Sequence, residues 1–237
     1  MTTRIDEIAD GIYRISTAIP PETTMPGFTF NQFLVVDEEP LLYHTGPRRT
    51  FFDVKSAIER VMPVAKLRWV AFSHYEADEC GTLNAFLGLA KRAVPACSEI
   101  AKMASVDDTS DRPARALKDG EELVLGRHRV RWLSTPHLPH AWECGHLFES
   151  ETRTLFCGDL FTQLGHVHEP ITEKDILEPS EEGRRAFDYY ANPPTQHALF
   201  EKLARTQPTT LACMHGASWR GDGAKLLLAL DRKLATA

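Results

Sequence analysis

A chain of 237 residues in which 43% of the side chains are hydrophobic can bury one sizeable core, and we expect a single domain over residues 1–237. The formal charge of −6 and the lack of a Lys/Arg-rich tract exclude the basic surface with which proteins bind nucleic acid or an anionic membrane. No stretch approaches the roughly 18 apolar residues of a membrane span, and the N-terminus has no apolar signal segment, so we expect a cytoplasmic protein.

The first third of the chain is expected to form an antiparallel meander of short strands with a proline- and glycine-rich loop between them. Apolar residues at helical spacing then predict a helix over residues 50–61, which Pro63 closes. A buried strand at 67–72 and a helix at 82–91 follow. The strands of the meander are expected at 12–16, 32–36 and 40–43, and its loop contains Pro20, Pro21, Pro26 and Gly27.

The rest of the chain is expected to hold a second meander and then helices. Residues 105–120 are polar and are expected to form a connection inside the domain. Strands are predicted at 122–125, 128–133, 145–148, 154–157 and 210–213, and helices at 184–190, 197–205 and 223–234.

Residues 74–81 read His-Tyr-Glu-Ala-Asp-Glu-Cys-Gly and follow directly on the predicted strand at 67–72. They therefore connect a strand to a helix, where layered α/β folds place their active sites. Side chains alternate in extended backbone, so His74, Glu76 and Asp78 are expected to face one way and to converge on a metal ion. The alternative is a solvated acidic loop, because short motifs of this kind also arise without a site.

Three later segments also place a polar residue after an apolar strand. His137 and His140 follow the strand at 128–133, Asp159 follows the strand at 154–157, and His215 follows the strand at 210–213. Taken singly, each has an ordinary explanation as a surface histidine or an Asx-turn. Their order along the chain, after the acidic segment 74–81, indicates one shared metal site.

This order resembles the metallo-β-lactamase superfamily, whose pattern is H-x-H-x-D-H followed by His, Asp and His. Glu76 in place of the second His is the hallmark of its flavodiiron branch, and the segments that begin at His140, Phe156 and Asp188 (HAWEC, FCGD and DYYAN) look like that branch as well. The resemblance implies an α/β (α+β) fold, a metallo-β-lactamase-like four-layered αβ/βα sandwich, without the flavodoxin-like FMN domain.

The resemblance also implies a ligand set for two iron ions. His74, Glu76 and His140 would bind one ion, Asp78 and His215 would bind the other, and Asp159 would bridge the two.

Two positions of this set stay open. Glu79 stands where the pattern has its last His, and it either ligates the second metal or turns away and leaves a coordination position free. His137 competes with His140 for the place of the third imidazole, and the Trp-Glu-Cys that follows His140 favours His140.

The ligand chemistry can be argued without the resemblance. Zinc favours Cys and His ligands, whereas a carboxylate in place of an imidazole hardens a site toward iron or manganese. Glu76 therefore favours iron, with zinc and manganese as alternatives. Four carboxylates, with Glu79 included, could balance the charge of two ferrous ions.

Further residues are expected around the ligands. His44 stands where the superfamily has an Asp that supports the metal-binding loop. It either orients a ligand through a hydrogen bond or is an ordinary turn histidine. Gln163 and His166 follow Asp159 and are expected on the substrate side, and His137 belongs to the same surroundings if His140 is the ligand.

Three functions remain open. The first is a non-haem diiron protein that reduces dioxygen or nitric oxide with electrons from a separate redox partner, such as a rubredoxin or flavodoxin-like protein. The second is an oxygen-binding sensor that a signalling partner reads. The third is a dinuclear metal-dependent hydrolase of a phosphodiester, thioester or lactone. The hydrolase predicts cationic groups at the pocket, for which the candidates are Arg48, Arg49, Arg184 and Arg185. The sequence leaves a homodimer open.

Overall fold

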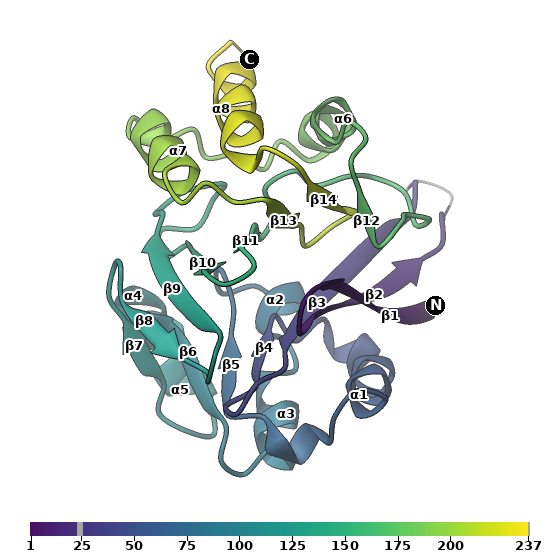
Figure 1. The fold of residues 1–237 in the computed structure, drawn as a ribbon, viewed down its shortest axis with the longest axis vertical. Coiled ribbons are helices and arrows are strands. Elements are labelled where there is room, and N and C mark those ends of the chain that lie inside the picture. The colour runs from purple at the N-terminus through teal and green to yellow at the C-terminus, as the bar shows by residue number, and fades with distance from the viewer. Residues whose placement is uncertain (23–25, 237) are drawn as a thin grey trace.

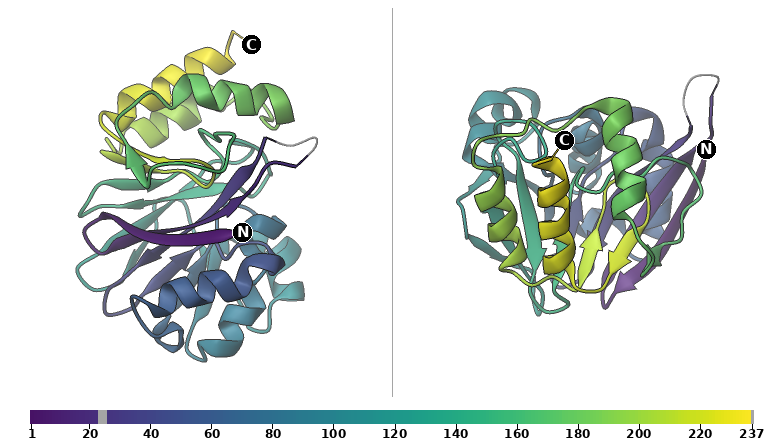
Figure 2. Two further views of the ribbon diagram at one scale, coloured as in Figure 1. Left: turned by 90° about the vertical axis from the view of Figure 1, so that its right-hand side faces the viewer. Right: turned by 90° about the horizontal axis from the view of Figure 1, so that it is seen from above.

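Two mixed β-sheets lie face to face, and helices cover the outer face of each (Figure 1). The computed structural model describes residues 1–22 and 26–236; residues 23–25, in the loop predicted within the first meander, and residue 237 lie outside it. The four layers are seen from the side in Figure 2 (left), with the C-terminal helices above the sheets and the N-terminal helices below them. This arrangement is the predicted αβ/βα sandwich.

Within the described residues, the first sheet contains seven strands in chain order. Its first strands pair antiparallel, and the pairs from β4 to β7 are parallel. The strands are β1 (Thr2–Ala9), β2 (Ile12–Ile19), β3 (Phe28–Val35), β4 (Leu41–Tyr43), β5 (Trp69–Ala71), β6 (Val94–Ser98) and β7 (Arg115–Leu117).

The second sheet, counted over the same described ranges, has seven strands in the order β12-β14-β13-β11-β10-β9-β8. Most neighbours pair antiparallel, whereas β11 with β13 and β12 with β14 are parallel. The strands are β8 (Glu122–Val124), β9 (Arg129–Ser134), β10 (Gly145–Glu149), β11 (Thr154–Phe156), β12 (Ile171–Thr172), β13 (Thr210–Ala212) and β14 (Ser218–Arg220).

Helices pack on the two outer faces. The first sheet carries α1 (Phe51–Glu59), α2 (Ala77–Cys80), α3 (Leu83–Leu89), α4 (Glu99–Ala101) and α5 (Asp107–Thr109), with short 3-10 turns at Arg48–Thr50 and Val64–Lys66 and a π-helical turn at Lys102–Val106. The second sheet carries α6 (Leu177–Phe187), α7 (Gln196–Ala204) and α8 (Gly223–Leu234). In the part of the chain that the structure describes, no helix is both long and apolar enough to span a bilayer.

Strand β3 shows why the layers stack as they do. Phe33 and Val35 belong to the hydrophobic cluster between the two sheets, whereas Leu34 belongs to the cluster under α1 and α3. Successive side chains of a strand point to opposite faces, so an uninterrupted apolar run is buried on both sides. A further cluster lies between the second sheet and α6 to α8. The core is thus divided among the interfaces of the four layers.

The structure adds strands β1, β6, β7, β12 and β14 to those predicted. β1 is a polar edge strand, and Ile8 is its one buried residue. Its sequence therefore lacks the alternation of apolar and polar residues that predicts a strand. β7 lies inside the segment 105–120, whose polar composition predicted a connection inside the domain. The strand was missed because neighbouring strands, and not local composition, order this edge.

Helix α6 begins and ends earlier than predicted. It spans 177–187 and not 184–190, because Asp188 adopts a left-handed conformation (φ 47°) that ends the helix. The helix predicted at 82–91 is α3, which spans 83–89. These shifts place Phe187 and Tyr189 beside the strand ends that carry the candidate site.

Replacing Phe156 with Ala should lower the free energy of unfolding by about 3–5 kcal/mol. Its ring is fully buried between the sheets, with centroids 5.6 Å from Phe33 and 5.1 Å from Tyr43. Phe52→Ala is the matched control, because the Phe52 side chain is 76% exposed and its loss should change stability by less than about 0.5 kcal/mol. Denaturant titrations measure both, and equal losses would show that Phe156 is not a core residue.

Candidate metal centre

The segment between β5 and α3 (residues 72–82, the metal loop) is not extended as predicted. Glu76 has extended backbone (φ −132°, ψ 161°), and the one-turn helix α2 begins directly after it. Successive helical residues point about 100° apart, so Asp78 faces the cavity and Glu79 enters the interior. The expected alternation in an extended chain is therefore wrong, although His74, Glu76 and Asp78 still reach one site.

Four predicted ligands from three separate loops lie close enough to share an ion. One ligand atom each from His74, Glu76, His140 and Asp159 lies within 4.8 Å of all the others. Nε2 of His140 is 2.9 Å from Nε2 of His74, and Oδ2 of Asp159 is 3.5 Å from Nε2 of His74. Ligands about 2.1 Å from an ion are spaced about 3.0–3.4 Å apart at octahedral or tetrahedral angles. The spacing therefore fits a metal ion.

Asp159 also faces a second group. Its Oδ1 is 3.1 Å from Nε2 of His215, and Oδ2 of Asp78 is 3.5 Å from the same nitrogen. The two oxygens of Asp159 thus point to the two groups, one to each. This is the disposition required of a carboxylate that bridges two ions.

The hydrogen bonding of His215 calls for a cation. Its Nδ1 lies 2.7 Å from the backbone oxygen of Thr29, which can only accept, so Nδ1 donates. In the neutral ring Nε2 then carries a lone pair, which faces oxygens of Asp159 and Asp78. Acceptors that face one another repel unless a proton or a metal ion lies between them, so these residues fit a metal ion.

The crowding of charges also shifts the pKa values of the ligands. Burial raises the pKa of Asp78 to about 6, and the charge of Glu79 adds to this effect although His215 opposes it. Hydrogen bonds from His140 and then His74 lower the pKa of Glu76 to about 2. Burial alone would lower the pKa of His74, but neighbouring carboxylates, Glu79 first, raise it well above its ordinary value. A metal therefore has to displace protons when it binds.

Residues of the first sheet hold the loop that carries His215. The Thr29 hydroxyl accepts a hydrogen bond from the N–H of Gly216 at 2.7 Å. Asn31 Nδ2 and Arg14 Nη2 both donate to the Gly216 carbonyl, at 2.9 and 2.7 Å. None of these three residues belongs to a recognisable motif. The polar residues at 29 and 31, which alternate with phenylalanines in β3, are the signal that could have indicated them.

The structure does not bring Glu79 to either ligand group. Its carboxylate is fully buried behind His74, where Oε2 lies 2.7 Å from Nε2 of His44 and 2.5 Å from Oγ of Ser73. The burial of Glu79 raises its pKa, but His44 and His74 oppose this and hold it below the ordinary value. Of the two alternatives for Glu79, the geometry favours the one in which it turns away.

His44 does contact the metal loop, through Glu79 and not through a ligand. Its backbone adopts a left-handed conformation (φ 64°), which histidine tolerates better than most residues. Positions 44 and 79, both of which depart from the family pattern, are therefore in direct contact.

The remaining predicted residues lie outside the ligand groups. His137 is exposed, whereas His140 contributes to the first group. Gln163 is buried and donates to the carbonyls of Phe161 and Ala217, so it supports a loop and does not face a substrate. His166 is half-buried beside Gly27. Neither Gln163 nor His166 lines the cavity at the ligands, which corrects the expectation that both do.

A cavity of about 540 Å³ opens over the ligands and has aromatic walls. The ring of Phe28 stacks on that of His215, with centroids 4.2 Å apart. Among the described residues that line this cavity there is no lysine or arginine; they are Phe28, Phe30, Glu76, Asp78, His140, Asp159, Thr162, Phe187, Tyr189 and His215.

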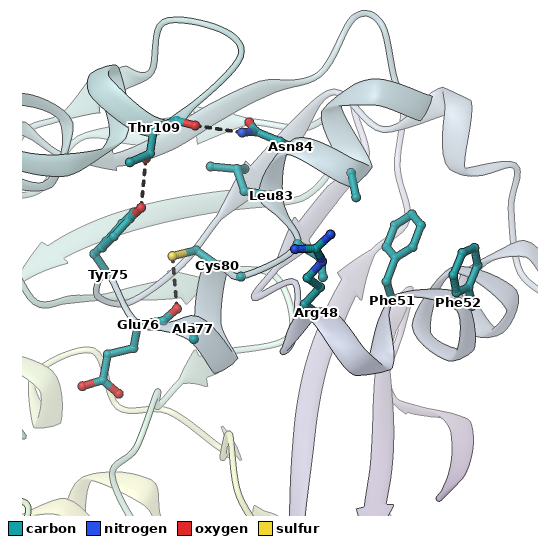
Figure 3. A pocket seen from close by; sticks show the side chains of 13 residues that line it. Arg48, Phe51, Phe52, Tyr75, Glu76, Ala77, Cys80, Leu83, Asn84 and Thr109 are labelled. Carbon is teal, nitrogen blue, oxygen red and sulfur yellow. Dashed lines mark hydrogen bonds between the residues drawn. The ribbon is translucent and has the colours of Figure 1, made fainter.

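None of the four arginines expected for an anionic substrate is among the described residues that line this cavity. Arg184 pairs with Glu181 at 2.9 Å, and Arg49 lies over the ring of Phe30, 5.8 Å from its centroid. Arg48 lines a different cavity of about 760 Å³ behind the metal loop (Figure 3). Glu76 borders both cavities, and its carboxylate points away from the second one.

Two helix-covered sheets with His, Glu and Asp ligands at the strand ends define the class of metallo-β-lactamase-like proteins with a candidate dinuclear metal site. A family model described as "ODP family beta lactamase" matches residues 28–216. The chain belongs to this family.

Named relatives share the same region. A nitric oxide reductase of Moorella thermoacetica is 24% identical over 242 residues, which cover 95% of this chain and 60% of the relative. A rubredoxin-oxygen oxidoreductase of Megalodesulfovibrio gigas is 26% identical over 204 residues, which cover 82% of this chain and 50% of the relative. The chain thus spans between half and 60% of the length of these relatives.

Solved structures confirm the fold. A rubredoxin oxygen:oxidoreductase from Desulfovibrio gigas matches with a TM-score of 0.84 at 22% identity, over 98% of this chain and 61% of that one. A metal-soaked flavodiiron core from Synechocystis matches with a TM-score of 0.84 at 20% identity, over 99% of this chain and 61% of that one. The predicted resemblance to the flavodiiron branch is confirmed.

His140→Ala should lose at least one metal ion per chain, because it removes an imidazole from the first ligand group. His137→Ala is the matched control and should retain the wild-type metal content, because the His137 side chain is exposed and outside the group. Elemental analysis after metal loading and desalting measures both. The reverse result would assign the third imidazole to His137.

Proposed function

We propose that this chain is a non-haem diiron protein that binds or reduces dioxygen or nitric oxide. The observation that carries the proposal is the carboxylate-rich ligand set, in which Glu76 takes a place that hydrolases of this fold give to an imidazole, and Asp78 and Asp159 add further carboxylates. Oxygen ligands favour iron or manganese over zinc. Their negative charges also offset those of two ferrous ions.

Each ligand has a defined part in this proposal. His74, Glu76 and His140 would hold one iron, Asp78 and His215 would hold the other, and Asp159 would be shared between them. Two ferrous ions would supply electrons to a bound diatomic molecule.

The cavity also supports this reading. Its walls are largely aromatic, and the ring of Phe28 stacks on that of His215. A pocket whose described lining has ligand carboxylates but no lysine or arginine suits a small neutral molecule better than an anionic ester.

Electrons used in turnover have to be replaced from outside the centre. We propose a separate redox protein of the rubredoxin or flavodoxin type as the donor. The names of two relatives, a nitric oxide reductase and a rubredoxin-oxygen oxidoreductase, support both the gaseous substrate and this kind of donor.

Protein loaded with ferrous iron without oxygen should bind about two irons per chain and should change its optical spectrum on addition of air or nitric oxide. Sustained gas consumption with reduced rubredoxin would indicate a reductase, and a spectral change without sustained consumption would indicate a sensor. Protein that takes up zinc alone and shows no response to either gas would overturn the proposal in favour of the hydrolase.

Asp159→Ala should abolish binding of both irons, because its two oxygens face the two ligand groups. Metal analysis and the nitric oxide spectrum measure this loss. Retention of two irons by the variant would contradict the bridging role.

A further inference from the structure

Glu79 is completely buried, yet neither of its oxygens belongs to a ligand group. Oε2 is approached by Nε2 of His44 at 2.7 Å, by Oγ of Ser73 at 2.5 Å and by the backbone N–H of Ser73 at 3.3 Å. The carboxylate accepts hydrogen bonds from the hydroxyl and the N–H of Ser73, and Nε2 of His44 lies within ion-pair distance of the same oxygen.

The hydroxyl of Ser73 connects Glu79 to His74, which is one of the proposed ligands. It has one proton, and donating that proton to Glu79 leaves only lone pairs for its other neighbour, Nδ1 of His74 at 2.9 Å. Nδ1 of His74 therefore has to carry a ring proton and donate it. In the neutral ring the lone pair then lies on Nε2, the atom 3.5 Å from Oδ2 of Asp159.

We propose that Ser73 and Glu79 are positioning residues for His74: they hold its proton on Nδ1 and so present Nε2 to the metal. His44 in turn holds Glu79 in place. The inference deepens the proposed function and rests on it for the identity of the metal. The presentation of Nε2 itself depends only on the hydrogen bonds of this chain.

The surrounding backbone makes the arrangement rigid. The N–H of Thr45 donates to the carbonyl of Glu79 at 2.7 Å, and Nδ1 of His44 contacts the sulfur of Met214 at 3.0 Å. Met214 directly precedes His215. The buried pair of His44 and Glu79 therefore connects the end of β4, the metal loop and the loop after β13. A side chain held in this way is unavailable as a ligand, which leaves Asp78, Asp159 and His215 for the second ion.

A second buried Glu–His pair does not contact the candidate metal centre and can serve as a control for Glu79 and His44. Glu149 and His128 are also fully buried, with Oε1 of Glu149 3.0 Å from Nδ1 of His128. Glu149 accepts from the N–H groups of Glu151 and Thr152, both at 2.8 Å. Its loss should destabilise the fold without affecting a ligand, which makes Glu149→Met the control for Glu79→Met.

The test uses zinc as a diamagnetic probe, with ring-nitrogen NMR to assign each histidine and chelator competition to measure affinity. In the wild-type protein, His74 should bind zinc through Nε2 and show a slowly exchanging Nδ1 proton. Ser73→Ala and Glu79→Met should lose the slow exchange and weaken zinc binding at His74 by about 10- to 100-fold. Glu79→Gln keeps an acceptor oxygen and should keep the slow exchange.

Glu149→Met and Ser98→Ala are the controls for loss of a buried acceptor and of a buried hydroxyl; Ser98 caps a helix through the N–H of Ala101. Both should lower thermal stability and leave zinc affinity unchanged. Equal weakening in the controls would overturn the inference, because the effect would then be structural.

Selective loss of zinc from His215 in Glu79→Met would also overturn the inference, because Glu79 would then be a ligand of the second ion. Ser73→Ala keeps the test decisive if Glu79→Met does not fold. Failure of the iron or gas experiments would leave these zinc results intact, so the two proposals can be refuted separately.

Discussion

The central constraint on this molecule is the electrostatic repulsion among the ligand atoms of the candidate metal centre, which the side chains alone do not relieve. Imidazole lone pairs and carboxylate oxygens converge on two adjacent points, with Asp159 between them. Buried charge of one sign is costly unless it is paired, so the arrangement is stable only with protons or cations in its centre. The raised pKa of His74 and the raised pKa of Asp78 are two signs of the same crowding.

The sandwich fold supplies the force that holds these groups together. The ligands follow β5, β9, β11 and β13, so the ends of strands from both sheets meet at one edge of the molecule. Hydrophobic clusters between the layers fix the sheets, and Thr29 and Asn31 of the first sheet bond directly to the loop after β13 of the second. Apolar packing therefore offsets the cost of assembling the carboxylates.

The strand ends that carry the candidate ligands could be predicted because they depend on local pattern, whereas the four-layered sandwich was implied by the resemblance to the metallo-β-lactamase superfamily. His74, His140, Asp159 and His215 each follow a short apolar run, and a run buried on both faces indicates a central strand. Edge strands such as β1 and β7 could not be predicted, since their pairing partners and not their own side chains order them. The role of Glu79 was also out of reach, because it is decided by the direction in which a one-turn helix points and by a contact with His44 that is distant in sequence.

The central claim is that two irons occupy this edge of the sandwich, and anomalous X-ray diffraction at the iron edge tests it most directly. Crystals of anaerobically loaded protein should show two peaks about 3.5–4 Å apart, one among His74, Glu76 and His140 and one between Asp78 and His215, with Asp159 reaching both. A single peak, a peak bound to Glu79, or an anomalous signal from zinc alone would contradict the account.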